Sequence, residues 1–347
     1  MPQISNVNIV SSAPLTPPAG ILAELPLAPQ AAATVLRARA AVADILERRD
    51  KRLLVIAGPC SIHDQESAVE YARRLGRLGG TVAERICLLM RVYFEKPRTT
   101  LGWKGLMYDP DMDGSYNIEK GIRTARRLLL DINGLGVPAA TEMLDPVIPQ
   151  YTADLIAWAA IGARTTESQT HRQLASGLSM PTGFKNTTDG SIQVAVDAIL
   201  TAASPHSFLG VNPDGRTAVF STSGNRFCHL VLRGGGAARP NYGSEFIAFA
   251  RELLRKASLP VNIMVDCSHD NSGGVPERQV DVLRDILRQI KGGERDIIGV
   301  MLESNLEPGR QELKAGRPAA PGLSVTDACL GWADTEALVR EAYAGLR

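Results

Sequence analysis

The sequence predicts an α/β fold, a closed (β/α)8 TIM barrel, and three observations lead to this prediction. The chain has 347 residues, a length at which such barrels usually form a single unit. Short apolar runs of strand character alternate with stretches long enough for a helix, which is the pattern of a parallel sheet. Eight runs fall into this rhythm, and eight strands close the barrel.

The predicted elements begin after an N-terminal segment. Residues 1–30 are rich in Pro, Ala and small polar residues and indicate an extended arm, and residues 30–49 have a helical apolar pattern. We therefore expect residues 1–50 to form an arm and helix outside the main domain, and residues 51–347 to form the barrel. The predicted barrel strands are Leu53–Ala57, Ile86–Met90, Val137–Ala140, Ala159–Ile161, Thr182–Phe184, Ser207–Val211, Val261–Val265 and Ile297–Leu302.

The spacing departs from this rhythm between the sixth and seventh predicted strands, which about 50 residues separate. Two pieces of strand character, Thr217–Ser221 and Cys228–Leu232, flank Gly224 and Asn225 in this interval. We therefore expect a β-hairpin inserted after strand 6.

The composition excludes several classes of protein. Hydrophobic residues make up 44% of the chain and charged residues 22%, which is typical of a soluble globular protein. The formal net charge of +1 gives no reason to expect a nucleic-acid or membrane partner. No apolar stretch approaches the roughly 20 residues that span a bilayer. Five scattered cysteines form no disulfide pattern and favour a reducing, cytoplasmic setting.

The end of nearly every predicted strand carries polar, ionisable or glycine-rich residues. In a barrel of this kind the carboxyl ends of the strands form one face, on which active sites are built. Taken singly, these residues have ordinary explanations: Cys60 as a small buried residue, Arg164 as a surface ion pair, Asp327 as a helix cap. The ordinary explanations do not predict their convergence on one face, so we interpret this face as the functional site.

Basic residues form the first group at this face. Burying several cations together costs several kcal/mol per ion unless anions accompany them. Arginine and lysine suit phosphate and carboxylate groups, so the sequence predicts substrates that carry several negative charges. The group consists of Arg91, Lys96, Arg98, Arg164, Lys185 and Arg233.

A thiol, an imidazole and two carboxylates form the second group, which could hold a divalent metal ion. Sulfur and nitrogen ligands argue against Mg²⁺ and Ca²⁺ and leave Mn²⁺, Fe²⁺, Co²⁺ or Zn²⁺. The residues are far apart in the sequence, so their spacing alone cannot establish the site. They are Cys60, His269, Glu303 and Asp327.

At these residues the sequence resembles type I 3-deoxy-D-arabino-heptulosonate 7-phosphate (DAHP) synthase, the bacterial and fungal form. The resemblance runs from about residue 5 to the C-terminus, and Lys96-Pro97-Arg98-Thr99-Thr100 is a highly specific motif. A sister enzyme that uses arabinose 5-phosphate shares the barrel but differs in this motif. The other matching segments are Gly58–Asp64, Arg91–Gly105, Gly162–Gln169, Leu232–Gly235, Cys267–His269 and Val325–Cys329.

The resemblance implies an enzyme that joins phosphoenolpyruvate to erythrose 4-phosphate, with addition of water and loss of phosphate, at the start of the shikimate pathway. It implies that the phosphate of phosphoenolpyruvate is held by the N–H of Ala163 and by Arg164, Lys185 and Arg233. Its carboxylate would face Arg91, Lys96 and Lys185, with Glu142 nearby. The phosphate of erythrose 4-phosphate would be held beside Pro97 by Arg98 and Thr99. The metal ligands would be Cys60, His269, Glu303 and Asp327.

The resemblance places Lys96 between the two substrate subsites. We therefore expect Lys96 to transfer a proton to the new alkoxide, with His269 or a metal-bound water as alternatives. The catalytic group would then comprise Lys96, His269 and Asp327.

The resemblance also implies a regulatory pocket, near the inserted hairpin and the N-terminal arm of a neighbouring subunit. Gly210 leads us to expect inhibition by tyrosine, because phenylalanine-sensitive relatives tend to carry serine there, which would crowd a para-hydroxyl group. Several short segments, such as Asn6–Ile9, are also more similar to the tyrosine-sensitive isoenzyme. An arm that reaches a neighbour implies a homodimer or homotetramer. The pocket positions are Met143, Pro149, Gln150, Leu178, Ser179, Phe208, Gly210 and Phe220.

Two alternatives stay open at this point. One is a catalytically silent barrel that senses an amino acid, and the complete metal and basic groups argue against it. The other is an enzyme of secondary metabolism with a related sugar phosphate or an amino analogue. Thr187, which stands where the family usually has glycine, keeps this second alternative open. If φ is positive there, Thr187 is strained by about 1–3 kcal/mol and displaces Lys185.

Overall fold

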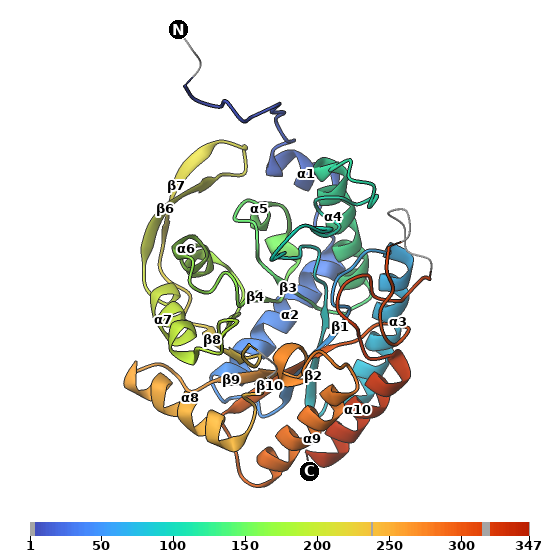
Figure 1. Cartoon of the computed structure of the whole chain (residues 1–347), viewed down its shortest axis with the longest axis vertical. Coiled ribbons are helices and arrows are strands. Elements are labelled where there is room, and N and C mark those ends of the chain that lie inside the picture. The colour runs from blue at the N-terminus through green and yellow to red at the C-terminus, as the bar shows by residue number, and fades with distance from the viewer. Residues whose placement is uncertain (1–3, 237–238, 314–319, 347) are drawn as a thin grey trace.

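The computed structural model describes residues 4–236, 239–313 and 320–346, and the predicted closed barrel is present (Figure 1). Its strands are parallel and follow the order β1-β10-β9-β8-β5-β4-β3-β2 around the barrel. The prediction of a (β/α)8 barrel is therefore confirmed. The barrel strands are β1 (Leu53–Gly58), β2 (Ile86–Arg91), β3 (Ala139–Glu142), β4 (Trp158–Ile161), β5 (Thr182–Lys185), β8 (Cys228–Leu232), β9 (Ile263–Asp266) and β10 (Ile297–Glu303).

The inserted hairpin precedes the sixth barrel strand, so its predicted position after strand 6 was wrong. β6 (His206–Val211) pairs antiparallel with β7 (Thr217–Thr222) in a separate two-stranded sheet, which lies outside the barrel (Figure 1). Cys228–Leu232, which was predicted to belong to the hairpin, is the barrel strand β8. Burial separates the two kinds of strand: β8 is buried throughout, whereas β6 and β7 alternate between exposed and half-buried residues.

Helices cover the outside of the barrel. Two of them begin at a side-chain cap, since Asp64 accepts a hydrogen bond from the backbone N–H of Glu66 at 3.1 Å, and Asn117 accepts one from that of Lys120 at 3.1 Å. The helices that follow strands are α3 (Gln65–Val82), α4 (Ile118–Gly134), α5 (Pro149–Thr152), α6 (Gln169–Gly177), α7 (Ile192–Ala202), α8 (Ser244–Lys256), α9 (Arg278–Lys291) and α10 (Trp332–Gly345), with 3-10 turns at Ala153–Leu155 and His269–Asn271.

The apolar core has two layers. One layer fills the space between the barrel and its outer helices. The other fills the barrel itself and is closed by α2 (Pro29–Leu46), whose Val42, Ile45 and Leu46 join residues along the barrel strands, including Leu54 and Ile298 near the strand beginnings. A hydrogen bond from Asn262 Nδ2 to the carbonyl of Leu46, 3.0 Å long, fixes α2 at this end. The barrel is therefore closed at its amino end and offers a site at its carboxyl end.

The N-terminal residues ahead of α2 include the short helix α1 (Pro18–Glu24) and an arm that leads away from the barrel (Figure 1). Among the described residues no single helix is long and apolar enough to cross a membrane. The bent pair formed by α1 and α2 passes such a test only when the two are taken together. The apolar side of α2 is packed under the barrel, which accounts for its composition.

Candidate functional site

The carboxyl ends of the barrel strands adjoin a cavity of about 700 Å³. The segments that follow β4, β8, β9 and β10 contribute its wall, so parts of the chain far apart in sequence meet there. This is the face that the sequence analysis identified. The predicted site residues that line the cavity are Arg164, Arg233, His269, Glu303 and Asp327.

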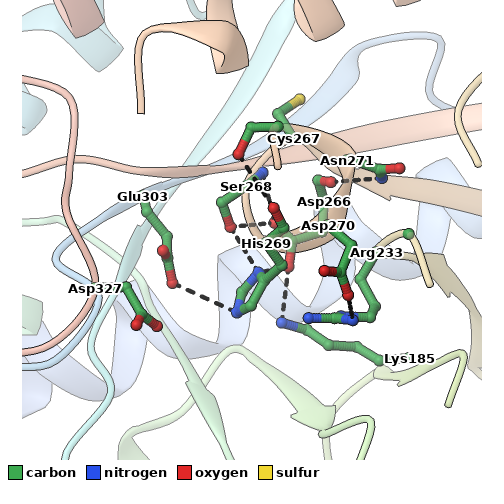
Figure 2. Close-up of polar contacts among 12 residues, drawn as sticks. Lys185, Arg233, Asp266, Cys267, Ser268, His269, Asp270, Asn271, Glu303 and Asp327 are labelled. Carbon is green, nitrogen blue, oxygen red and sulfur yellow. Dashed lines mark hydrogen bonds and ion pairs between the residues drawn. The ribbon is translucent and has the colours of Figure 1, made fainter. Parts of the chain in front are cut away.

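The register of the barrel brings the predicted metal ligands together. β1 pairs with β10 so that Gly58 lies opposite Glu303, and Cys60 follows two residues later. The Cys60 Sγ and one carboxylate oxygen from each of Glu303 and Asp327 lie within 4.8 Å of one another. His269 adjoins this group, with its Nε2 3.7 Å from Glu303 Oε1 (Figure 2). The mixture of sulfur, nitrogen and oxygen donors suits a transition metal ion.

Lys96 lies against the same group. Its Nζ is 3.0 Å from Cys60 Sγ and 3.9 Å from Asp327 Oδ2. Burial opposes the charge on Lys96, but Cys60, Glu303 and Asp327 outweigh it and raise the pKa of the ammonium group. Burial, reinforced by Glu303, raises the pKa of the Cys60 thiol to about 12. At neutral pH Lys96 is therefore protonated and Cys60 keeps its proton until a cation replaces it.

Arg91 is a buried cation at the end of β2. Its side chain is 1% exposed, and its Nη2 donates to Glu303 Oε1 at 2.8 Å. The guanidinium group also lies 3.6 Å from the centre of the Tyr93 ring, which stabilises the cation further. Its Nη1 is buried and makes no hydrogen bond to the described protein atoms. One donor of Arg91 is thus free for another acceptor.

Lys185 at the end of β5 is also buried and paired. Its Nζ donates to Asp266 Oδ2 at 2.8 Å, and the two side chains are 4% and 0% exposed (Figure 2). Burial opposes ionisation of Asp266, but Lys185 and His269 outweigh it and hold the pKa of this carboxyl well below its usual range. A buried ion pair therefore connects β5 with β9.

Two predicted basic residues that line the cavity, Arg164 and Arg233, lie nearer to solvent than Arg91 and Lys185. Arg233, which follows β8, pairs with Asp270 (Figure 2). Arg164, which follows β4, is exposed, and its Nε donates to Thr99 Oγ1 at 3.2 Å. Because Thr99 belongs to the Lys96–Thr100 motif, this contact joins the two groups of residues that were predicted to hold the two phosphates.

The other predicted substrate residues occupy the same end of the barrel. Glu142 ends β3, and its Oε1 is buried without a hydrogen-bond partner among the described residues. Gly162 leaves room for this carboxylate, because a Cβ at that position would lie 2.2 Å from Glu142 Oε1. Ala163 follows and is half-buried. Pro97 and Arg98 lie in the loop after β2, where Arg98 is exposed.

Thr187 does not strain the loop that follows β5. It does not adopt positive φ, so the strain considered in the sequence analysis is absent at this residue. Its Oγ1 accepts a hydrogen bond from the backbone N–H of Ser191 at 3.0 Å, and its own hydroxyl bonds to Asp189. Lys185 keeps its contact with Asp266, so the departure from the family pattern does not displace it.

Three site residues were missed by the sequence reasoning. Asp266 ends the buried run of β9, and a charged residue there was a usable signal. Asp270 directly follows His269 and pairs with Arg233. Arg310 lines the cavity from the loop after β10, where no pattern in the sequence sets it apart from other surface arginines.

A second cavity, of about 610 Å³, lies between α5, α6 and the β6–β7 hairpin. Phe208 and Phe220 stack across the hairpin with ring centres 6.0 Å apart. Met143 is buried in the core and does not line this cavity. The predicted regulatory residues that line it are Pro149, Gln150, Leu178, Ser179, Phe208, Gly210 and Phe220.

Comparisons with known proteins agree with this arrangement. Residues 26–340 match the DAHP synthetase I family. Phospho-2-dehydro-3-deoxyheptonate aldolase, Phe-sensitive, of Escherichia coli K12 is 55% identical over 327 residues, 94% of this chain and 93% of that protein. The Tyr-sensitive protein of the same organism is 50% identical over 344 residues, 99% and 96% of the two chains. The structure of a phospho-2-dehydro-3-deoxyheptonate aldolase from Francisella tularensis SCHU S4 superimposes with a TM-score of 0.95, at 47% identity over 98% of both chains.

We expect the affinity of the site for Mn²⁺ to rise with pH. Burial raises the pKa of Cys60 to about 12, so a metal ion must displace the thiol proton. Each unit of increasing pH raises the thiolate fraction, and the apparent affinity should rise about tenfold per unit for one released proton. Calorimetric titration between pH 7 and pH 8.5 measures this slope.

Cys60→Ala should bind Mn²⁺ weakly, and its affinity should no longer rise with pH. Cys228→Ala, which alters a buried cysteine of β8, should keep the affinity of the unmodified chain and its dependence on pH. A pH-independent affinity in the unmodified chain would contradict the assignment of Cys60. So would undiminished binding in a Cys60→Ala/His269→Ala double variant.

Proposed function

This chain belongs to the DAHP synthetase I family, and we propose that it condenses phosphoenolpyruvate with D-erythrose 4-phosphate and water to give DAHP and phosphate. This reaction is the first step of the shikimate pathway. The observation that carries the proposal is the meeting of buried cations with a sulfur, nitrogen and oxygen donor set at one end of the barrel. Two phosphorylated substrates repel each other in water, and a site rich in fixed cations removes that repulsion.

Phosphoenolpyruvate would occupy the part of the cavity beside Arg233 and Lys185. Its phosphate would be held by Arg164, Lys185, Arg233 and the N–H of Ala163. The carboxylate would face Arg91, Lys96 and Lys185, with Glu142 close by. The unpartnered Nη1 of Arg91 supports this assignment, because a buried guanidinium donor without an acceptor is costly until an anion supplies one.

Erythrose 4-phosphate would bind toward the rim, with its phosphate on Arg98 and Thr99 beside Pro97. Two features support this assignment. Arg98 is exposed and therefore open to an incoming phosphate. Thr99 contacts Arg164 through a 3.2 Å hydrogen bond, so the two phosphate subsites adjoin each other. The reacting carbons of the two substrates would then lie near Lys96.

The donors Cys60, His269, Glu303 and Asp327 fit a divalent transition metal ion, Mn²⁺, Fe²⁺, Co²⁺ or Zn²⁺. A bound ion would supply Lewis acidity to the aldehyde oxygen. Lys96 is held protonated beside this group and would deliver its proton to the oxygen that becomes an alkoxide. The catalytic group proposed here is therefore Lys96, His269 and Asp327.

Substitution of Lys96 and of Arg98 should give different kinetic signatures. Lys96→Ala removes a proton donor and an orienting charge together, so kcat should fall by at least ~100-fold. Arg98→Ala should chiefly raise KM for erythrose 4-phosphate and leave KM for phosphoenolpyruvate within about twofold. Initial rates of phosphate release, measured with each substrate varied in turn, separate the two effects. If Arg98→Ala weakened phosphoenolpyruvate alone, the assignment of the two subsites would be reversed.

We propose that the second cavity is a regulatory site for an aromatic amino acid, and that the ligand is tyrosine. No ionisable side chain is found among the residues that line it, so a zwitterion without net charge suits it better than an anion. The stacked rings of Phe208 and Phe220 offer an aromatic side chain a flat apolar surface. Hydroxyl and amide groups of residues such as Ser179 and Gln150 can satisfy the amino and carboxylate groups.

Gly210 and Phe220 act together in this proposal. A Cβ at residue 210 would lie 2.9 Å from Cε2 of Phe220, so the space above Gly210 is partly filled by that ring. Glycine at position 210 therefore lets the Phe220 ring lie in its present position, and we infer that a para-hydroxyl group would sit at this end of the cavity. Serine at position 210 would push the ring into that end of the cavity.

The N-terminal arm and α2 region, residues 1–50, would serve oligomerisation and regulation beside the catalytic barrel of residues 51–347. Ile9 and Val10 in the arm are exposed apolar residues, and so are Leu209 and Val219 on the outer side of the hairpin. Contact between an arm and a hairpin of different subunits would bury both, which supports a homodimer or homotetramer.

Tyrosine should inhibit the unmodified chain at least ~10-fold more strongly than phenylalanine or tryptophan. Gly210→Ser should weaken inhibition by tyrosine, because the displaced Phe220 ring would occupy the space of the hydroxyl group. Gly210→Ser/Phe220→Leu should recover part of the affinity for an aromatic amino acid. Leu135→Ala, which alters an exposed residue just after α4 that lines neither cavity, serves as the control and should leave inhibition unchanged.

Titration of the activity with each amino acid measures these effects. Stronger inhibition of the unmodified chain by phenylalanine or tryptophan, or inhibition by none of the three, would refute the tyrosine assignment.

A further inference from the structure

Asp266 forms the centre of a hydrogen-bond network at the end of β9 (Figure 2). The side chain is fully buried. Its Oδ1 accepts hydrogen bonds from the backbone N–H of Ser268 at 3.1 Å and from the Ser268 hydroxyl at 2.7 Å. Its Oδ2 lies 2.8 Å from Lys185 Nζ and 2.9 Å from His269 Nδ1. One carboxylate therefore touches both a cation of the anion site and an imidazole of the metal site.

The hydrogen bonds of this network determine the tautomer of His269. The Ser268 hydroxyl has one hydrogen, which it donates to the carboxylate oxygen Oδ1 of Asp266. Ser268 Oγ also lies 2.7 Å from His269 Nδ1 and can only accept in that contact. Oδ2 of Asp266, on the other side of the same nitrogen, is an acceptor too. Nδ1 must therefore carry the proton.

The other ring nitrogen is then the one left for a metal ion. With the proton on Nδ1, the neutral imidazole has its lone pair on Nε2, which lies 3.7 Å from Glu303 Oε1. The backbone of His269 adopts φ of 56°, an unfavourable conformation for a residue with a side chain. The network that surrounds Nδ1 holds the ring in this position.

We propose that Asp266 is a positioning residue that fixes His269 as the Nδ1–H tautomer and presents Nε2 to the metal ion. The proposal rests on the proposed function in that it takes His269 as a metal ligand. Lys185 also takes part in this positioning, because its Nζ donates a hydrogen bond to Oδ2 of Asp266 and so orients the carboxylate toward Nδ1 of His269. The anion site and the metal site are thus joined through a single side chain.

An asparagine at position 266 cannot replace the carboxylate in this network. If the amide oxygen faced Ser268, the amide nitrogen would face Lys185 and His269 as a donor. The imidazole would then have to accept at Nδ1 and carry its proton on Nε2, the nitrogen needed by the metal ion. In the flipped orientation the amide nitrogen would face the backbone N–H of Ser268, which is also a donor.

Mn²⁺ affinity measured without substrates tests the proposal. Asp266→Asn should bind Mn²⁺ about 10–100-fold more weakly than the unmodified chain, the range typical for loss of a partner that orients a ligand. Lys185→Met should also weaken Mn²⁺ binding, by about fivefold or more, although Lys185 touches none of the four ligands. Asp270→Asn is the matched control: it removes a carboxylate four residues away that pairs with Arg233, and Mn²⁺ affinity should stay within about twofold.

A spectroscopic measurement separates a positioning role from a general loss of structure. The chain has 5 histidines, so ¹⁵N-histidine labelling gives a small set of ring signals, and His269→Gln assigns the relevant pair. The metal-free unmodified chain should show protonated Nδ1 at His269, and Asp266→Asn should show protonated Nε2. Unchanged signals from the other four rings would show that the fold is intact.

Wild-type Mn²⁺ affinity in Asp266→Asn, or an unchanged tautomer of His269, would overturn the proposal. Neither measurement needs substrate turnover. If both expected changes are observed but the unmodified chain does not use erythrose 4-phosphate, the proposed role of Asp266 stands and the proposed reaction is refuted. A chain that binds no Mn²⁺ at all would overturn the role of Asp266 in metal binding.

Discussion

Closure of the barrel is the constraint on which the site depends. Eight parallel strands that close on themselves bring all their carboxyl ends to one face, and the residues there are enclosed by their neighbours. Arg91 and Lys185 are almost fully buried in this position. Charges in such surroundings cost several kcal/mol each unless they are paired. The acidic residues Glu303 and Asp266 supply that pairing from β10 and β9, which the barrel places within reach.

This pairing has a consequence for binding. The carboxylates that balance the cations also belong to the proposed metal site or contact one of its proposed ligands: Glu303 contacts Arg91 and adjoins His269, and Asp266 contacts Lys185 and His269. In the proposed site, a metal ion and an anionic substrate would therefore act on shared groups. A metal ion at Glu303 would partly neutralise the carboxylate that now pairs with Arg91. The Arg91 guanidinium would then be more available to an anion. In this way a nearly neutral chain would bind the proposed substrates, which carry several negative charges.

Much of the fold could be predicted because buried strands and covering helices have clear sequence patterns. The error at the hairpin has a physical cause. Ser207–Val211 and Cys228–Leu232 are both short and rich in apolar residues, and only their burial in the folded chain separates an outer hairpin from a barrel strand. The predicted number of barrel strands was correct, but Ser207–Val211 was assigned as the sixth barrel strand in place of Cys228–Leu232.

The position of a residue at this end of the barrel could be predicted where it ends a strand or directly follows one, as Lys185 and Arg233 do. The ion pairs that these residues form could not be predicted. No sequence rule states that Lys185 meets Asp266 across the barrel, because that contact depends on the register of strands far apart in the chain. Met143, which directly follows β3, was predicted from the resemblance to line the regulatory pocket. Its side chain is instead buried in the core.

Phosphate release from phosphoenolpyruvate tests the central claim most directly, with the purified chain and either erythrose 4-phosphate or arabinose 5-phosphate as the second substrate. Each pair is assayed with Mn²⁺ and again after exhaustive chelation. The account predicts release with erythrose 4-phosphate and Mn²⁺, little or none with arabinose 5-phosphate, and loss of activity on chelation that Mn²⁺ restores. Equal release with arabinose 5-phosphate, or full turnover in the chelated chain, would contradict it.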